Sequence, residues 1–352
     1  MKTKKLTPQL LLSFVLLAVV GATCGAVAYL SGVKPIYYFI LVASVFLTVQ
    51  LTALFHEFGH YIATKNSGFE VYYFKFSCFT VDKYGRKKFK ISLFNKHLGE
   101  MRFYPKAEGR YSKNLEKSLR GGLIGNLLIA FILNVCLILA LLGVFGKTAS
   151  PYFVISLAFS PYAVYAYIIN AIPWFHPLSD GAQIKRLKEN EEERQAVDNL
   201  YAIQKCLFDG KTYQEIPKGY FSVGKSVSEE LKTFLTLYSF RRAVETEDEE
   251  SAEALASVLD GQNHSDDEIC CELLYWYVLK NDGQKIEEYS SILSFNGSTD
   301  NLTVFRGMIA FARYRGDENY VKVATPTAIK LCREEKLCKG DALYNLKLIK
   351  RL

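Results

Sequence analysis

The sequence predicts an all-α, polytopic membrane core of about four transmembrane helices with a small membrane-associated β element, followed by a soluble, repeat-like α-helical domain. A membrane-spanning helix needs ~20 consecutive apolar residues. Four stretches of at least that length contain no Asp, Glu, Lys or Arg: 6–33, 35–55, 121–146 and 148–179. After Asp180 no such stretch recurs, and charged residues are dense to the end of the 352-residue chain. The chain therefore divides into a membrane half and a soluble half.

The four stretches predict spans at about 8–30, 36–64, 119–146 and 151–174, within a core that covers 1–188. The first stretch has a second interpretation, because a Lys-rich start, an apolar run and an Ala-Val-Ala sequence at 26–28 are typical of a cleaved signal peptide. Its uncharged run is longer than a typical signal-peptide core, and this favours an uncleaved helix.

Basic residues gather in one loop of the core. Between Lys65 and Arg120 there are 14 Lys and Arg against 5 Asp and Glu, whereas 183–352 contains 24 against 29. A basic excess beside membrane spans marks the cytoplasmic side, while nucleic-acid binding would place it on a folded domain. We therefore expect no nucleic-acid partner. We expect a multi-pass protein of a bacterial cell membrane, with its N-terminus, its 65–118 loop and its C-terminal domain in the cytoplasm.

One motif in the second span carries chemistry. His56-Glu57-Phe58-Gly59-His60 lies at the cytoplasmic end of that span. Residues i and i+4 of a helix project from one face with Cβ atoms ~5–6 Å apart. The two imidazoles can therefore bind one Zn²⁺ ion while Glu57 points toward a water molecule on the metal. Three ionisable groups at membrane depth are costly and need a function to retain them, which favours this interpretation over two histidines that merely pack.

A catalytic zinc ion takes three protein ligands and keeps an open fourth position. Asp180, which follows the fourth apolar stretch, is the best candidate for the third ligand. An Asp-Gly pair is also typical of a turn, or of the N-cap of a helix over 182–188. His176 is a further candidate, although its Trp-Phe-His-Pro surroundings fit an interfacial aromatic patch. His97 and His264 have no partner at ligand spacing.

Together these motifs resemble the site-2 protease family of intramembrane zinc metalloproteases, over about 36–188. The family's metal helix is matched by His56, Glu57 and His60. Its Gly-rich segment with a nearby Asn is matched by Gly121, Gly122, Gly125 and Asn126. Its third-ligand segment is matched by Asn170, Pro173, Asp180 and Gly181. Two departures stand out: the gap between Pro173 and Asp180 is longer than in the commonest family form, and Ala182 replaces a frequent second glycine.

The resemblance implies a zinc metalloendopeptidase that cleaves a transmembrane or membrane-associated peptide, with the lipid bilayer as its surroundings. His56, His60 and Asp180 would hold the zinc ion, and Glu57 would act as the general base. Asn126 and Asn170 would hold an unwound substrate or stabilise an oxyanion, although asparagine in a helix bundle also commonly hydrogen-bonds between helices. The alternative from another functional class is a non-catalytic membrane scaffold that recruits a partner through its cytoplasmic helical domain.

A short β element is expected after the metal helix. Aromatic residues and valine alternate with polar residues over 69–80, which predicts a strand. The 68–104 stretch also resembles the membrane-associated β-hairpins of the same family. A free strand edge there would offer a place for substrate to add as a further strand.

The soluble half is predicted to hold a linker with helical segments over 189–227 and a tetratricopeptide-like domain over 228–352. Three helix pairs are expected over 234–255, 273–293 and 305–324, with turns centred on Glu247, on Asn281 and Gly283, and on Gly316. The spacing of about 33–34 residues matches the tetratricopeptide period. The functional interpretation is a docking surface for a cytoplasmic partner or for the substrate's tail. The alternative is a lid that only stabilises the membrane core.

Overall fold

The computed structural model describes residues 35–76, 79–81, 87–89, 99–146, 149–261, 267–293 and 301–352. The chain forms two compact units, 1–190 and 191–352. The predicted first span at 8–30, together with its signal-peptide alternative, lies outside the described residues, as do His97 and His264. The number of transmembrane helices, about four, therefore stays a prediction.

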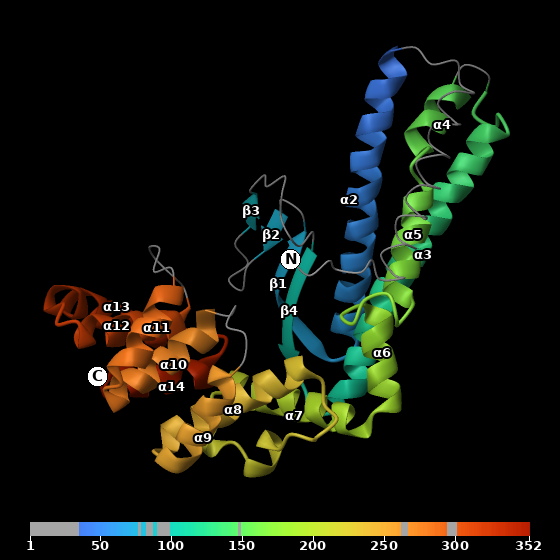
Figure 1. Ribbon diagram of the computed structural model, residues 1–352. Coiled ribbons are helices and arrows are strands. Elements are labelled where there is room, and N and C mark those ends of the chain that lie inside the picture. Colours follow the sequence, from blue (N-terminus) through green and yellow to red (C-terminus); the bar gives the residue numbers. More distant parts are fainter. Residues whose placement is uncertain are drawn as a thin grey trace, which may run out of the picture. The chain divides into compact units, whose positions relative to one another are not determined.

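The first unit consists of helices with a small sheet beside them (Figure 1). Its helices are α2 (Pro35–Asn66), α3 (Tyr111–Leu141), α4 (Ser150–Leu157), α5 (Pro161–Ala171) and α6 (Asp180–Glu189). Three helical stretches are long and apolar enough to cross a membrane: Ile40–Asn66, Tyr111–Leu141 and Tyr152–Ala171. They correspond to the second, third and fourth predicted spans.

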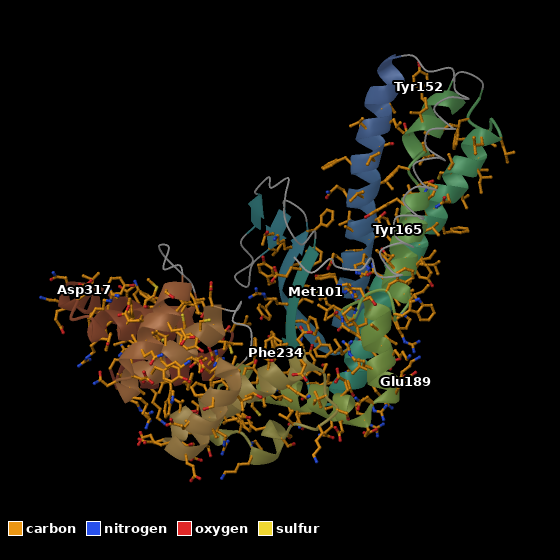
Figure 2. All side chains as sticks on the ribbon, viewed as in Figure 1. Met101, Tyr152, Tyr165, Glu189, Phe234 and Asp317 are labelled. Atoms are coloured by element: carbon orange, nitrogen blue, oxygen red, sulfur yellow. The ribbon has the colours of Figure 1, made fainter. Side chains whose placement is uncertain are left out.

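Large apolar side chains on α2 and α3 point away from the other helices of the unit. Val42 on α2 is 70% exposed, and Ile124 and Phe131 on α3 are 65% and 66% exposed. A soluble protein rarely leaves so much contiguous apolar surface in water, whereas lipid is a suitable solvent for it. In Figure 2 side chains project outward along the bundle, in which Tyr152 and Glu189 mark opposite ends and Tyr165 lies between them.

The third helix begins eight residues before the predicted 119 because its first turns are charged. Lys113, Glu116, Lys117 and Arg120 all lie on α3. Such residues are good helix formers, and Glu116 accepts hydrogen bonds from the Arg120 guanidinium one turn later, at 2.6 and 3.0 Å. The length of the uncharged stretch therefore predicted the apolar part of this helix, but not the charged turns that precede it.

The predicted fourth span is two helices rather than one. A break at 158–160 separates α4 from α5, and Pro161 occupies the first turn of α5. Proline has no N–H to continue a helix and clashes with the preceding turn. The Asn134 side chain of α3 donates to the main-chain carbonyl of Ser160 at 3.3 Å and accepts from its hydroxyl at 3.3 Å. Ser160 is 0% exposed, so these bonds satisfy polar groups that would otherwise be buried without a partner.

Close packing of α2 on α3 positions the site. A Cβ atom at Gly59 of α2 would lie 2.1 Å from the carbonyl oxygen of Gly121, and one at Gly125 would lie 2.1 Å from the carbonyl oxygen of Phe55. Small residues of this kind let two membrane helices approach until their backbones touch. The glycines of α3 therefore lie directly against the part of α2 that carries the His-Glu-x-x-His motif.

A four-stranded antiparallel sheet follows α2, and its first strand lies within 69–80, where the alternation predicts a strand. The strands are β1 (Phe69–Phe76), β2 (Phe79–Val81), β3 (Lys87–Phe89) and β4 (Gly99–Pro105), in the order β3-β2-β1-β4. Gly68, at φ +85°, makes the turn from α2 into β1. The Tyr61 ring of α2 contacts the Phe74 ring of β1, with centroids 5.6 Å apart. The sheet is therefore attached to the metal-motif helix by both chain and side chains.

The second unit is helical. It contains α7 (Glu191–Phe208), two short 3₁₀ turns (Tyr213–Glu215 and Lys218–Phe221), α8 (Glu229–Thr246), α9 (Glu249–Asp260), α10 (Asp267–Lys280), α11 (Gly283–Ile292), α12 (Leu302–Tyr314), α13 (Glu318–Glu334) and α14 (Lys339–Ile349). Its main core draws on α7 to α12 and α14.

The 189–227 segment, predicted as a linker with helical segments, contains helix α7 and contributes buried residues to the core of this unit. Ile203, Tyr213 and Val227 are all buried within it. The Glu193 carboxylate of α7 accepts from the main-chain N–H and the hydroxyl of Ser228, each at 2.7 Å. The Gly- and Ser-containing stretch over 219–227 resembles a linker in its composition. In the structure the Glu193 carboxylate, 35 residues away, fixes the residue that follows it, Ser228.

The three expected helix pairs share one local geometry. α8 and α9 are separated by Glu247, α10 and α11 by Asn281, and α12 and α13 by Gly316, and each of these three residues has a φ between 55° and 72°. The next residue, Asp248, Asp282 or Asp317, is in every case an N-cap that accepts from a main-chain N–H of the following helix. The assignment of the unit to the tetratricopeptide class stays a prediction.

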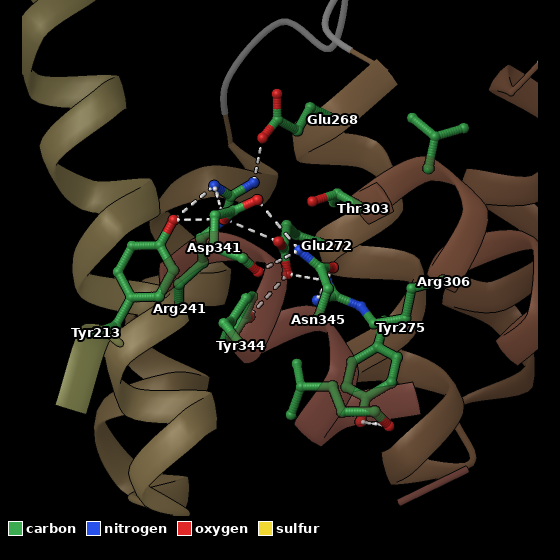
Figure 3. Close-up of polar contacts among 12 residues, drawn as sticks. Tyr213, Arg241, Glu268, Glu272, Tyr275, Thr303, Arg306, Asp341, Tyr344 and Asn345 are labelled. Atoms are coloured by element: carbon green, nitrogen blue, oxygen red, sulfur yellow. Dashed lines mark hydrogen bonds and ion pairs between the residues drawn. The ribbon is translucent and has the colours of Figure 1, made fainter. Parts of the chain in front are cut away.

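A buried network of charged and aromatic side chains lies inside the second unit (Figure 3). Glu272 and Arg306 are 0% exposed and Arg241 is 3% exposed. Glu272 accepts from Nε of Arg241 at 2.7 Å, pairs with Arg306 through its other oxygen, and also accepts from the Tyr344 hydroxyl at 3.1 Å. Buried charges must be paired in this way, so the network requires α8, α10, α12 and α14 to be in register.

Candidate metal centre

His56, Glu57 and His60 lie in the last third of α2, where the apolar stretch gives way to polar residues. The i, i+4 spacing brings the two imidazole centroids to 4.5 Å and their Nε2 atoms to 3.2 Å. His60 is buried, and His56 and Glu57 are half-buried. The sequence prediction that both rings share one face is confirmed.

The other nitrogen of each ring contacts the main chain of α3. Nδ1 of His56 lies 3.2 Å from the carbonyl oxygen of Gly122, and Nδ1 of His60 lies 2.9 Å from the carbonyl oxygen of Ser118. A carbonyl only accepts, so in the neutral imidazole Nδ1 carries the hydrogen and Nε2 presents its lone pair. Metal-binding histidines are commonly oriented in this way.

Asp180 completes the group. It is the first residue of α6 and is buried, and its Oδ2 lies 3.3 Å from Nε2 of His60 and 3.7 Å from Nε2 of His56. The N-cap of α6 is Ser179, whose hydroxyl accepts from the N–H of Ala182 at 3.3 Å. The alternative of Asp180 as the cap is therefore wrong, because Ser179 performs that role and leaves the Asp180 carboxylate available.

Contacts of α6 bring Asp180 back to α2 across the long gap after Pro173. The amide of Gln183 donates to the carbonyl of Leu178 at 2.9 Å, and the Arg186 guanidinium donates to the carbonyl of Pro177 at 2.6 Å. Gly181 packs so closely on α5 that a Cβ atom there would lie 2.0 Å from the carbonyl oxygen of Ala171. The residues between Pro173 and Asp180 form a loop, and side chains of α6 hydrogen-bond to its main chain.

These three side chains fit a metal ion. Ligand atoms ~2.0–2.1 Å from a tetrahedral zinc ion lie about 3.3 Å from one another, and the separations here are 3.2, 3.3 and 3.7 Å. Asp180 Oδ2 is buried and accepts no hydrogen bond. Two imidazole lone pairs and a carboxylate oxygen that face one another repel unless a proton or a metal cation lies between them. His56, His60 and Asp180 are also the group with metal-binding geometry among the residues that the structure describes.

The other candidates occupy different places. Asn126 lies one turn beyond Gly122 on α3, is 1% exposed, and has no hydrogen-bond partner for either its side-chain oxygen or its nitrogen. Asn170 is half-buried in the last turn of α5, next to the point where Gly181 packs. His176 is exposed, and its Nδ1 accepts from the N–H of Leu178. His176 therefore does not belong to the group.

Sequence reasoning named Gly122 only as part of a Gly-rich segment, and it missed Ser118 and the contacts that both residues make with the ligands. Gly122 both accepts a hydrogen bond from His56 and leaves room for His60, since a Cβ atom there would lie 2.3 Å from Nε2 of His60. Ser118 orients His60 and also hydrogen-bonds to the Thr64 hydroxyl. The Gly-Gly pair on α3 was a visible signal, but only the packing of α3 on α2 shows which side chain each glycine accommodates.

Replacing Gly122 with alanine is expected to lower zinc affinity by about 10–100-fold, because the new methyl group overlaps the His60 ring and breaks its orientation. Isothermal titration or competition with a chelating dye measures the affinity. Ile124→Ala, at an exposed position of the same helix, is the control and should retain wild-type affinity. Equal affinities for the two variants would contradict the role assigned to Gly122.

Comparisons of the chain with protein-family models, with curated proteins and with solved structures gave no match.

Proposed function

We propose that this protein is an intramembrane zinc endopeptidase that cleaves a membrane-embedded or membrane-adjacent peptide near the cytoplasmic face. The observation that carries the proposal is the convergence of His56, His60 and Asp180 beside Glu57, at the end of a helix apolar enough to span a membrane. A bound zinc ion would supply Lewis-acid activation of a water molecule and of the scissile carbonyl group. Three protein ligands would leave its fourth position open for this purpose.

Glu57 is the residue placed to move the proton. As general base it takes a proton from the water whose oxygen attacks the carbonyl carbon, and it passes that proton to the amine nitrogen as the C–N bond breaks. His56, His60 and Asp180 form the group that could hold the ion, and Glu57 is not one of its ligands. The Glu57 carboxylate lies next to these ligands in the chain and is therefore free to act as a base. The products are a carboxylate and an amine, and no other reactant is consumed.

Two further features support a peptide substrate. A helix in lipid has its amides internally bonded, so cleavage requires the peptide to unwind and to find new partners. The Asn126 amide is buried with both polar atoms unpaired, which suits a substrate carbonyl or amide group. β4 lies at one end of the strand order, and its outer edge suits a peptide that adds as a further strand.

Location and partners follow from the same proposal. We place the protein in a cell membrane with the 65–118 loop and the C-terminal unit in the cytoplasm, because the basic residues gather in that loop. The C-terminal helical unit is proposed to bind a cytoplasmic protein or the substrate's cytoplasmic tail.

Glu57→Gln is expected to lower turnover by at least about 10²–10⁴-fold, the usual contribution of a general base, while zinc content is unchanged. Quantitative mass spectrometry of peptide termini, in membranes that contain either the wild type or Glu57→Gln, identifies the substrate by the termini that depend on Glu57. Metal content measured on the same two purified proteins is the control. Identical sets of termini would contradict the proposal and favour the non-catalytic scaffold.

A further inference from the structure

The first residue of β4 touches the side chain of Glu57. A Cβ atom on Gly99 would lie 2.2 Å from Cδ and Oε1 of Glu57 and 2.3 Å from its Cγ. Non-bonded carbon and oxygen atoms do not approach so closely, so the backbone of Gly99 packs directly on the Glu57 carboxyl group. This contact comes from a strand rather than from the helices that hold the ligands.

Backbone conformation does not explain this glycine. Gly99 pairs with Phe76 in an ordinary antiparallel register, which any residue can adopt. The requirement for glycine is therefore steric, and it is imposed by the carboxyl group of Glu57.

The strand cannot easily move aside. β4 pairs with β1 from Gly99↔Phe76 to Pro105↔Phe69. β1 in turn begins shortly after α2 ends and carries Phe69, which is 3% exposed and packs on Phe103 with ring centroids 4.9 Å apart. A side chain at 99 would therefore displace the Glu57 carboxylate before it displaced the sheet.

The geometry points to Gly99 as a positioning residue for Glu57: the strand end holds the carboxylate at the metal centre while it accepts and returns the proton. This inference rests on the proposed function and adds a residue to it. Through this contact a shift of β4 would change the position of the Glu57 carboxyl group, and with it the rate of the proposed reaction.

Gly99→Ala tests the inference. We expect kcat to fall by about 10²-fold, the usual effect of a ~1 Å misplacement of a reacting group, with KM and zinc content unchanged. Gly109→Ala is the matched control, because a Cβ atom there would meet only the Asn114 amide, at 3.9 Å. In a Glu57→Gln background Gly99→Ala should have no further effect on kcat, since the base is already lost.

Other outcomes overturn the inference. A higher KM with unchanged kcat would make Gly99 a substrate-contact residue, loss of zinc would make it a structural one, and behaviour equal to Gly109→Ala would give it no role. The Co²⁺-substituted protein provides a readout that does not need turnover. Glu57→Gln and Gly99→Ala should both alter its visible absorption spectrum, and Gly109→Ala should not.

These two readouts separate the hypotheses. If the wild type shows no Glu57-dependent cleavage, the proposed function fails, and the cobalt spectra alone then decide whether Gly99 positions Glu57. A Gly99→Ala spectrum identical to that of the wild type would overturn the positioning role, whatever the activity.

Discussion

His60→Ala is expected to abolish metal binding and, with it, all zinc-dependent cleavage. The reason is that His60 is the centre of the ligand group: its Nε2 lies 3.2 Å from that of His56 and 3.3 Å from Oδ2 of Asp180. Two remaining ligands cannot hold zinc in a catalytic site that normally uses three. The loss should exceed the about 10–100-fold that follows from disturbing a residue around the ligands.

The measurement is zinc per protein after purification, by inductively coupled plasma mass spectrometry, together with affinity from chelator competition. His176→Ala is the matched control, because His176 is exposed and outside the group. Asp180→Asn should also lower zinc occupancy, since it removes the negative charge of the carboxylate whose Oδ2 faces the two rings. Full zinc occupancy in His60→Ala would show that the protein binds zinc at another site.

Glu272→Gln is expected to destabilise the C-terminal unit by about 3–5 kcal/mol, the usual cost of removing one partner from a buried ion pair. Glu272 is 0% exposed and binds Arg241 and Arg306 with separate oxygens. An amide keeps the shape and loses the charge. Arg306 then loses the carboxylate with which it pairs, at a position enclosed by the rings of Tyr275 and Tyr344 at 4.7 and 5.0 Å.

The tyrosines of the network do not compensate for this loss. Burial raises the pKa of the Tyr213 and Tyr344 hydroxyls well above the usual value. Both side chains therefore stay neutral and supply hydrogen bonds without negative charge. Asp341 faces Arg241 rather than Arg306, with Oδ1 3.5 Å from Nη1 of Arg241, so it does not replace the lost charge beside Arg306.

Urea unfolding of the full-length protein, followed by tryptophan fluorescence, measures the effect. The chain has two tryptophans; Trp276 is buried in α10 and Trp174 is 67% exposed, so Trp174→Phe isolates the signal of the C-terminal unit. Glu287→Gln is the control, because its pair with Arg315 is exposed and such pairs contribute about 0–1 kcal/mol. A Glu272→Gln midpoint equal to that of Glu287→Gln would show that the buried network does not determine stability.

The histidine pair of the site could be predicted because its signal is local. The i, i+4 spacing of His56 and His60 depends only on helical geometry, so two ligands on one face follow once the helix is assigned. Asp180 was harder to assign. Its interpretations as a ligand, as part of an Asp-Gly turn or as an N-cap differ in where its carboxylate lies. That depends on the approach of α6 to α2, which brings Oδ2 of Asp180 to 3.3 Å from Nε2 of His60, while Ser179 caps the helix.

In the C-terminal unit, too, local features could be predicted and long-range contacts could not. The turn positions Glu247, Asn281 and Gly316 were readable because a polar or glycine residue that interrupts an apolar periodicity marks a turn, and each of the three has positive φ. The helical pattern within 189–227 was predicted, but the packing of this segment on the unit was not, because its attachment depends on the Glu193–Ser228 contact across 35 residues. The buried partners of Glu272 come from three other helices, and none is a near neighbour in the chain.

Periodicity and uncharged length were enough to predict the helices that are apolar enough to span a membrane, the histidine pair and its glutamate, the alternating strand, and the helix pairs of the second unit. They could not predict where α3 and α6 approach α2, which glycine accommodates which side chain, or that Gly99 touches Glu57. The physical reason is that helix and strand formation depend on residues a few positions apart, whereas a ligand group and its supports are assembled from segments whose meeting depends on packing across the whole unit.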